Sequence, residues 1–209
     1  MWANLTNLLK LGGPISAALI FMSAVATVLS LVKAVQFFRS GLGRHARARE
    51  AASLFMNGQW EQAEMLINTA ESPLERVLLH AFSMISLSAQ NIDIVKEDVL
   101  RAALDEIREA KTYLRGIEII AQTAPLMGLL GTVVGMIQAF NRLESSGAAV
   151  NPAQLAGGIW TALLATALGL IVAIIFSVVG AWFESRIERE RGVMESILTS
   201  LFARLAMNM

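Results

Sequence analysis

Charged side chains are missing from three long stretches of the chain, residues 12–32, 119–141 and 145–183. These stretches contain 21, 23 and 39 residues. A helix that crosses a bilayer needs about 20 mostly apolar residues, so the first two stretches each predict one span. In the third stretch the only turn-forming segment lies at the start, before Pro152. We therefore expect one helix from Pro152 to Phe183, about 48 Å long, which exceeds the thickness of the hydrocarbon core.

The segment between the first two spans, residues 39–115, is polar and has helical patterning. Ser72, Pro73 and Glu75 are typical of a helix start, because Ser72 can act as N-cap, Pro73 fits the first helical position and Glu75 completes a capping box. A short amphipathic helix is expected to open around Trp60. From Asp93 onward apolar residues recur at helical spacing with charges between them: Val95, Val99, Ala102 and Ala103, Ile107, Ala110, Leu114 and Ile117.

No Pro or Gly interrupts this last pattern before Gly116, where the second apolar stretch is about to begin. The simplest interpretation is one long helix that continues into the second span. The mixed charges of residues 184–191 extend the third span in the same way, as a solvated helix face. With no strand pattern in the sequence, we predict an all-α membrane protein with three transmembrane helices. The second and third of these extend into a helical cytoplasmic domain.

The distribution of Lys and Arg predicts the orientation of the spans. Only Lys10 precedes the first span and only Arg142 lies between the second and third, whereas residues 39–115 hold ten basic side chains. Because cytoplasmic loops carry the excess of Lys and Arg, the N-terminus and the loop after the second span are expected outside. The expected organisation is an outer N-terminus (1–13), transmembrane helices (14–38, 116–141 and 152–183), a helical cytoplasmic domain (39–115), an outer loop (142–151) and a cytoplasmic C-terminal helix (184–209).

The first span has one alternative interpretation, a cleaved signal peptide. Residues 23–26, Ser-Ala-Val-Ala, resemble a cleavage site. However, the apolar run continues through Val32 and is followed by a basic cluster, which favours a retained anchor.

Composition excludes several classes of protein. Hydrophobic residues make up 55% of the chain and charged residues 16%, so long apolar segments must be hidden from water. The net charge of zero argues against a nucleic-acid-binding protein. Without cysteine, disulfides and thiolate chemistry are impossible. Neither His45 nor His80 belongs to a catalytic motif, and no P-loop, nucleophile elbow or zinc-protease motif is present, so an enzyme is not expected.

The second and third spans each have a face of small residues. On the second span this face carries Pro125, Gly128, Gly131, Thr132, Gly135 and Ala139, and on the third it carries Gly158, Ala162, Ala165, Thr166, Gly169, Ala173 and Gly180. Such faces let helices pack closely in lipid, which is the plain structural interpretation. Pro125 also removes one backbone hydrogen bond and is expected to kink the second span.

Threonine hydroxyls on or beside these faces favour a functional interpretation. Thr132, Thr161 and Thr166 could line a wet path, although a Thr hydroxyl also often bonds to its own helix. Residues 119–141 and 145–183, which make up nearly all of the two spans, contain no ionisable side chain. A proton carrier needs such a group inside the membrane, so either the chain moves no ions or a partner supplies the titrating group.

Two segments resemble the signature of the MotA/TolQ/ExbB proton-channel family, in its ExbB/TolQ branch. They are Ala-Pro-Leu-Met-Gly-Leu-Leu-Gly-Thr-Val-Val-Gly at 124–135 and Gly-Gly-Ile-Trp-Thr-Ala-Leu-Leu-Ala-Thr-Ala-Leu-Gly-Leu at 157–170. The three-span layout with its large cytoplasmic segment is similar too, so the resemblance covers most of the chain. The branch usually has a glutamate in a Gly-Ile-x-Glu-Ala-Leu pattern, and this chain has Thr161 there.

The resemblance implies an inner-membrane subunit that forms a homopentamer around a dimer of a single-span ExbD/TolR-like protein. The partner's membrane aspartate would take up protons, and the resulting motion would pass to a TonB- or TolA-like protein that spans the periplasm. The family's lumen-facing threonines match Thr132 and Thr166. No cofactor or metal is implied. A non-conducting membrane scaffold and a MotA-like flagellar stator are the alternatives, the latter disfavoured because MotA proteins have four spans.

Overall fold

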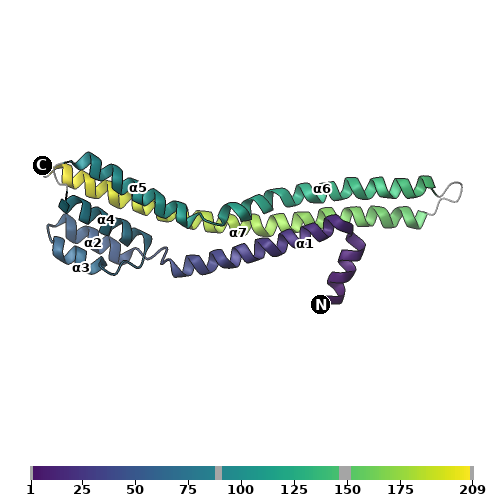
Figure 1. Cartoon of the computed structure of the whole chain (residues 1–209), viewed down its shortest axis with the longest axis horizontal. Coiled ribbons are helices and arrows are strands. Elements are labelled where there is room, and N and C mark those ends of the chain that lie inside the picture. The colour runs from purple at the N-terminus through teal and green to yellow at the C-terminus, as the bar shows by residue number, and fades with distance from the viewer. Residues whose placement is uncertain (1, 88–90, 146–151, 208–209) are drawn as a thin grey trace. The chain divides into compact units, whose positions relative to one another are not determined.

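The computed structural model describes residues 2–87, 91–145 and 152–207, and every regular element in this part of the chain is a helix. The described residues form these helices, labelled in Figure 1: α1 (Trp2–Arg39), α2 (Ala46–Met56), α3 (Trp60–Ile67), α4 (Pro73–Leu87), α5 (Ile92–Ala110), α6 (Leu114–Ser145) and α7 (Pro152–Met207). The predicted all-α fold is confirmed. Three helices are long and apolar enough to cross a membrane, over Gly13–Arg39, Leu114–Glu144 and Leu155–Met207.

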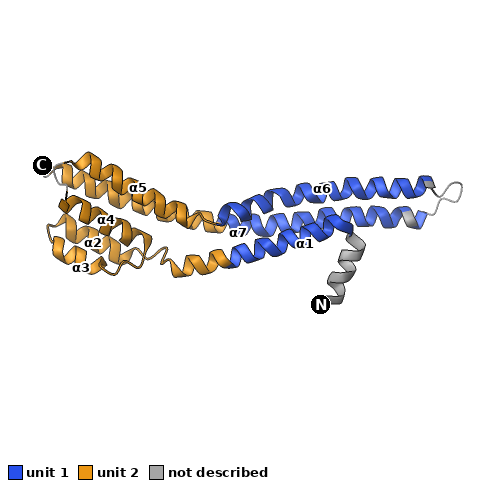
Figure 2. Cartoon of the chain, viewed as in Figure 1, with its two compact units in different colours: residues 1–31, 113–181 blue, residues 32–112, 182–209 orange. Residues whose placement is uncertain are grey.

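The chain divides into two compact units, coloured separately in Figure 2. Unit 1 contains residues 1–31 and 113–181, and unit 2 contains residues 32–112 and 182–209. Unit 1 therefore holds most of the apolar length of α1, α6 and α7. Of the expected outer loop 142–151, residues 146–151 lie outside the described part of the chain.

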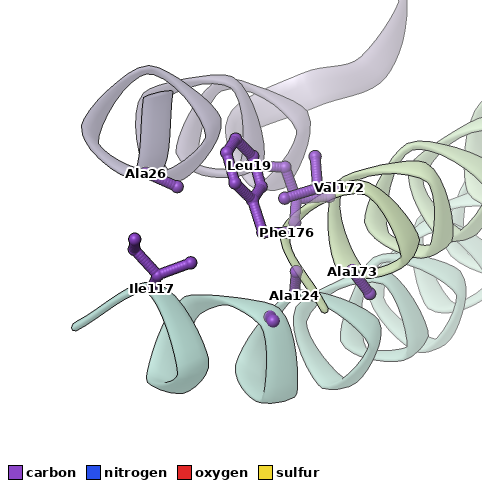
Figure 3. Close-up of a cluster of buried hydrophobic side chains, with 8 residues drawn as sticks. Leu19, Ala26, Ile117, Ala124, Val172, Ala173 and Phe176 are labelled. Carbon is purple, nitrogen blue, oxygen red and sulfur yellow. The ribbon is translucent and has the colours of Figure 1, made fainter. Parts of the chain in front are cut away.

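Unit 1 is built on a cluster of buried apolar side chains from α1, α6 and α7 (Figure 3). Leu19 and Ala26 of α1 meet Ile117 and Ala124 of α6 and Phe176 of α7. Small side chains alternate with large ones in this cluster, so the three helices approach closely while the larger groups fill the remaining space. Within α1 the backbone leaves helical geometry at Gly13, whose φ is +66°, directly before Pro14.

Unit 2 packs the short helices around aromatic and alanine side chains. Phe55 of α2 stacks on Phe82 of α4 with 4.3 Å between ring centroids, and Trp60 of α3 also stacks on Phe55, at 5.4 Å. The predicted start of α4 is correct: the Glu75 N–H donates to Ser72 Oγ at 3.3 Å. The Glu75 carboxylate accepts the N–H of Glu71 rather than that of Ser72, at 2.8 Å.

The helix expected to run unbroken from residue 93 into the second span is interrupted. α5 ends at Ala110, α6 begins at Leu114, and Tyr113 between them has a φ of +67°. The expectation of one continuous helix is wrong here, because no glycine or proline marks the break in the sequence. Long-range contacts mark it instead: Lys33 Nζ donates to the Ala110 carbonyl and Gln36 Nε2 to the Glu109 carbonyl, which satisfies acceptors at the end of α5.

Within unit 2, a buried carboxylate holds the charged continuation of α7 against the segment that precedes α2. The side chain of Glu190 is 2% exposed, and its Oε2 accepts the Gly43 N–H at 2.9 Å and lies 2.7 Å from His45 Nε2. His80 similarly pairs with Asp98 at 2.7 Å, between α4 and α5. Both histidines thus take part in pairs that join elements of unit 2.

Candidate functional site

The small residues predicted on the second and third spans face one another in unit 1. A Cβ atom added at Gly131 would lie 2.5 Å from the Cβ of Ala165, and one added at Gly135 would lie 2.7 Å from the Cβ of Ala162. These separations are shorter than any ordinary carbon–carbon contact. The backbones of α6 and α7 therefore touch along this row, as small-xxx-small packing requires.

Contacts to backbone atoms of the facing helix lie beside Pro125. A Cβ atom at Gly169 would lie 2.6 Å from the carbonyl oxygen of Ala124, and one at Gly128 would lie 3.0 Å from the Cα of Thr166. α6 continues as a helix through Pro125. Because proline has no N–H, the Ala121 carbonyl loses its usual helical donor at this level.

Three of the threonine hydroxyls bond within their own helices. Thr132 Oγ1 donates to the Leu129 carbonyl at 2.7 Å, Thr161 Oγ1 to the Gly157 carbonyl at 2.9 Å, and Thr123 Oγ1 to the Ile119 carbonyl at 2.8 Å. Each oxygen keeps its lone pairs available to accept a further hydrogen bond. These groups can therefore hold a water molecule or a protonated carboxyl without losing their own donor bond.

Thr166 differs, because its hydroxyl joins the two helices. Its Oγ1 donates to the Gly128 carbonyl of α6 at 2.8 Å. The bond is possible because Gly128 has no side chain to keep the α7 backbone away. Thr166 thus combines a packing role with a hydroxyl oxygen close to α6.

Helix geometry places Thr132 and Thr166 on the same side of the α6–α7 pair. At 100° per residue, Thr132 lies about 40° around α6 from Gly128 and about 60° from Gly135, in the direction in which the helix turns. Thr166 is displaced from Ala162 and Gly169 by the same angles, and in the same sense, around α7. Because the two helices run antiparallel, rotations of the same sense on each lead to the same side of the pair. The two hydroxyls therefore border one face of the hairpin.

α1 occupies the opposite side. A Cβ atom at Gly131 would lie 3.3 Å from Ile15, and one at Gly116 would lie 3.1 Å from Leu29, both α1 side chains. Gly131 precedes Thr132 by one residue, so it lies about 100° from Thr132 around α6, on the side where α1 packs. The face with Thr132 and Thr166 is thus the one that α1 leaves uncovered.

Thr161 lies apart from the other two threonines. It lines a cavity of about 240 Å³ together with Gly13 of α1 and residues of the α6–α7 pair. The other lining residues are Gly135, Gln138, Ala139, Arg142, Gly157 and Gly158. The three residues predicted to share a path are therefore divided in this chain between the α1 side and the uncovered side.

Comparison with known proteins identifies the family. The family model for the MotA/TolQ/ExbB proton channel family matches residues 69–196, which include α4 to α6 and most of α7. The chain belongs to the MotA/TolQ/ExbB proton channel family. Since that family comprises membrane transport proteins and the chain has three apolar helices of sufficient length, the chain is a membrane protein.

Individual relatives place the chain in the ExbB/TolQ branch of that family. It is 26% identical over 164 residues to biopolymer transport protein ExbB-like 3 of Synechocystis sp., covering 78% of this chain and 77% of the relative. It is 28% identical over 187 residues to biopolymer transport protein ExbB of Neisseria gonorrhoeae, covering 82% and 83%. An ExbB homologue of Methanothermobacter thermautotrophicus is 30% identical over 131 residues, 63% of this chain but only 45% of that protein.

Sequence reasoning missed one polar residue of this ExbB/TolQ-type chain that lies within an apolar helix. Lys33 of α1 is 1% exposed and bonds to the Gln36 Oε1 at 3.0 Å as well as to the end of α5. Its signal was present in the sequence: a lone cation followed three residues later by an amide, at the end of an apolar run. That signal does not reveal the partner, since Ala110 lies 77 residues away.

Proposed function

We propose that this chain is a proton-channel subunit of ExbB/TolQ type in the inner membrane of a bacterium. It uses the proton motive force, together with an ExbD/TolR-like single-span partner, to drive a TonB- or TolA-like protein for outer-membrane transport or envelope maintenance. The observation that supports this proposal most is the position of Thr132 and Thr166 on the uncovered face of the α6–α7 hairpin, where the helices pack tightly and carry no charged side chains. Hydroxyls on such a face can hydrogen-bond a water molecule or a protonated carboxyl group, but they are not themselves ionised near neutral pH.

The absence of ionisable groups from the apolar stretches of the second and third spans supports a partner in this proposal. Residues 119–141 and 152–183 contain no Asp, Glu, His, Lys or Arg. A proton path requires such a group within the membrane. In the proposal the partner's aspartate enters against the uncovered face, and a homopentamer of this chain surrounds a partner dimer, as the family resemblance implies. No cofactor, metal or nucleic acid takes part, and the chain catalyses no reaction.

Thr161 has a separate place in this proposal, because it lies on the α1 side of the hairpin rather than on the face of Thr132 and Thr166. It stands where the ExbB/TolQ branch usually has a glutamate, and it lines the cavity beside Gly13. A hydroxyl there can hold a water molecule but cannot store a proton as a carboxylate does. We therefore assign Thr161 a water-holding role, while Pro125, Gly128, Gly131, Gly135, Ala162 and Gly169 keep the hairpin closely packed.

Proton flux through the complex tests the proposal. The chain is co-expressed with an ExbD/TolR-like single-span protein, reconstituted into liposomes and assayed for proton uptake under an imposed potential. Thr132→Val and Thr166→Val should each lower the flux by at least about tenfold. Thr123→Val is the matched control, because Thr123 bonds to its own helix in the same way but lies on another face of α6.

A second candidate, a non-conducting membrane scaffold, is favoured by the hydrogen bond from Thr166 to Gly128. If the chain only packs helices, Thr166→Val lowers stability, Thr132→Val has no effect, and the complex carries no proton flux. A flagellar stator of MotA type receives no support from the three apolar helices of the described chain.

A further inference from the structure

The uncovered face also carries three polar side chains besides the threonines. Gln122 of α6 and Ser177 of α7 are exposed within the apolar spans, and Glu118 is half-buried near the beginning of α6. Within the described residues none of the three side chains makes a hydrogen bond. An amide and a carboxyl that face lipid are costly, so a face that carries them is expected to border water or protein.

The three residues line up with the threonines. Around α6, Glu118 and Pro125 lie within about 40° of Thr132, and Gln122 lies within about 80° on the same side. Around α7, Ser177 lies about 20° from Thr166. Both rows therefore border the face that α1 leaves uncovered.

Close contacts fix the level of these residues along the hairpin. Gly128 of α6 meets Thr166 of α7, and nearer the beginning of α6 the side chains of Ile117 and Glu118 lie 3.9 Å from a Cβ placed at Gly180. Ser177 precedes Gly180 by less than one helical turn. Glu118 and Ser177 are thus at about the same level on adjacent helices, about three to four turns from the Thr132–Thr166 level.

Pro125 supplies an acceptor between these two levels. The carbonyl of Ala121 has lost its helical donor to the proline, and it points along α6 toward residue 125, which lies on the same row. Gln122 is adjacent in sequence. The row therefore contains, from residue 118 to residue 132, a carboxyl, an amide, a released carbonyl and a hydroxyl.

We propose that Glu118, Gln122 and Ser177, with the Ala121 carbonyl, form the cytoplasmic half of the proton path, with Glu118 as the group that exchanges protons with the cytoplasm. This inference rests on the proposed channel function and on the orientation that places residues 39–115 in the cytoplasm. It adds an ionisable group of this chain to a route whose other titrating group belongs to the partner. Gln122 and Ser177 act as positioning residues that hold water between Glu118 and the threonines.

Water access tests the inference without any need for conduction. The chain contains no cysteine, so single cysteines can be placed in the full-length protein in membranes and treated with a hydrophilic thiol reagent from the cytoplasmic side. Gln122→Cys and Ser177→Cys should react at least about tenfold faster than Leu126→Cys and Val178→Cys, because a thiol in an apolar environment stays protonated and unreactive. The two control positions are exposed apolar residues on the same helices.

Proton flux in the reconstituted complex is the second measurement. Glu118→Gln and Gln122→Leu should each lower the flux by about tenfold or more, whereas Glu144→Gln, the same loss of charge at the other end of α6, should leave it near the unsubstituted level. Equal labelling at positions 122, 126, 177 and 178 would overturn the inference whether or not the complex conducts. Flux that is abolished by Thr132→Val but unchanged by Glu118→Gln and Gln122→Leu would also overturn it, while leaving the proposed function intact.

Discussion

Single residues with buried polar groups hold unit 2 together. The Glu190 carboxylate accepts a hydrogen bond from the Gly43 N–H and pairs with the imidazole of His45. The Lys33 ammonium donates to the Ala110 carbonyl at the end of α5. Both side chains are almost completely buried. A buried charge is tolerated only with such partners, so removal of either side of the contact leaves an uncompensated group inside the protein.

Glu190→Ala is therefore expected to lower the free energy of unfolding of the detergent-solubilised protein by about 3 kcal/mol. Glu190→Gln should cost less, because the amide oxygen still accepts the Gly43 N–H. Urea unfolding followed by circular dichroism measures both changes. Glu195→Ala is the control on the same helix: Glu195 pairs with Arg191 on the exposed surface, and its loss should change stability by less than about 1 kcal/mol. Equal effects of Glu190→Ala and Glu195→Ala would contradict this account.

At the scale of elements, two features determine how the helices meet: the contact row between α6 and α7 and the break between α5 and α6. The row depends on the absence of side chains, since Gly169 faces the Ala124 carbonyl directly. The break depends on Tyr113, whose backbone has a left-handed conformation that residues other than glycine rarely adopt.

The contact row makes Gly169→Ala a demanding change. The added methyl would lie 2.6 Å from a backbone oxygen, which cannot move aside as a flexible side chain can. We expect a loss of about 1–3 kcal/mol, seen as a thermal midpoint lower by several degrees in a fixed detergent. Gly157→Ala makes the same substitution on the same helix where no atom lies within 4 Å. It should leave the midpoint unchanged or slightly raised, because alanine favours the helix more than glycine does, and a similar drop for both variants would refute the close packing.

The break predicts opposite effects for two substitutions at position 113. Tyr113→Gly should raise stability by up to about 1 kcal/mol, because glycine adopts positive φ without steric cost. Tyr113→Val should lower it by about 1–2 kcal/mol, since a β-branched side chain fits this conformation poorly. Thermal unfolding of both variants beside Tyr113→Phe, which keeps the backbone cost, measures the difference. If valine were tolerated as well as glycine, a continuous α5–α6 helix would be the better description.

At the scale of the whole molecule, three apolar helices and the distribution of basic residues define the proposed topology. If the three apolar helices of the described residues each cross the membrane once, residues before α1 and after α7 lie on opposite sides. In that proposal the C-terminal side is cytoplasmic, because Lys and Arg are in excess in residues 39–115 and after residue 183. Loops with few basic residues are left for the periplasmic side.

Single cysteines at exposed positions test this topology in intact cells whose outer membrane has been made permeable. Glu144→Cys should react with a membrane-impermeant thiol reagent. Ser196→Cys should react only after the inner membrane is opened. Both positions are exposed in the structure, so failure to react reports on sidedness rather than on burial. Reaction of both positions before the inner membrane is opened, or of Ser196→Cys alone, would reject the assignment.

The sequence by itself determined the class of fold, the three apolar helices, the start of α4 at Pro73 and the small-residue faces of α6 and α7. All of these depend on local composition, spacing and capping, which act within a few helical turns. The family signatures lie in the same local patterns, so they too were readable.

Only the tertiary structure decided what depends on contacts between distant segments. The break at residues 111–113 carries no proline or glycine, and Lys33 and Gln36 bind the carbonyls at the end of α5 from more than 70 positions away. The pairing of Glu190 with Gly43 and His45 is equally remote in sequence. The division of Thr161 from Thr132 and Thr166 follows from where α1 packs, and one helix's periodicity contains no information about which neighbour covers which face.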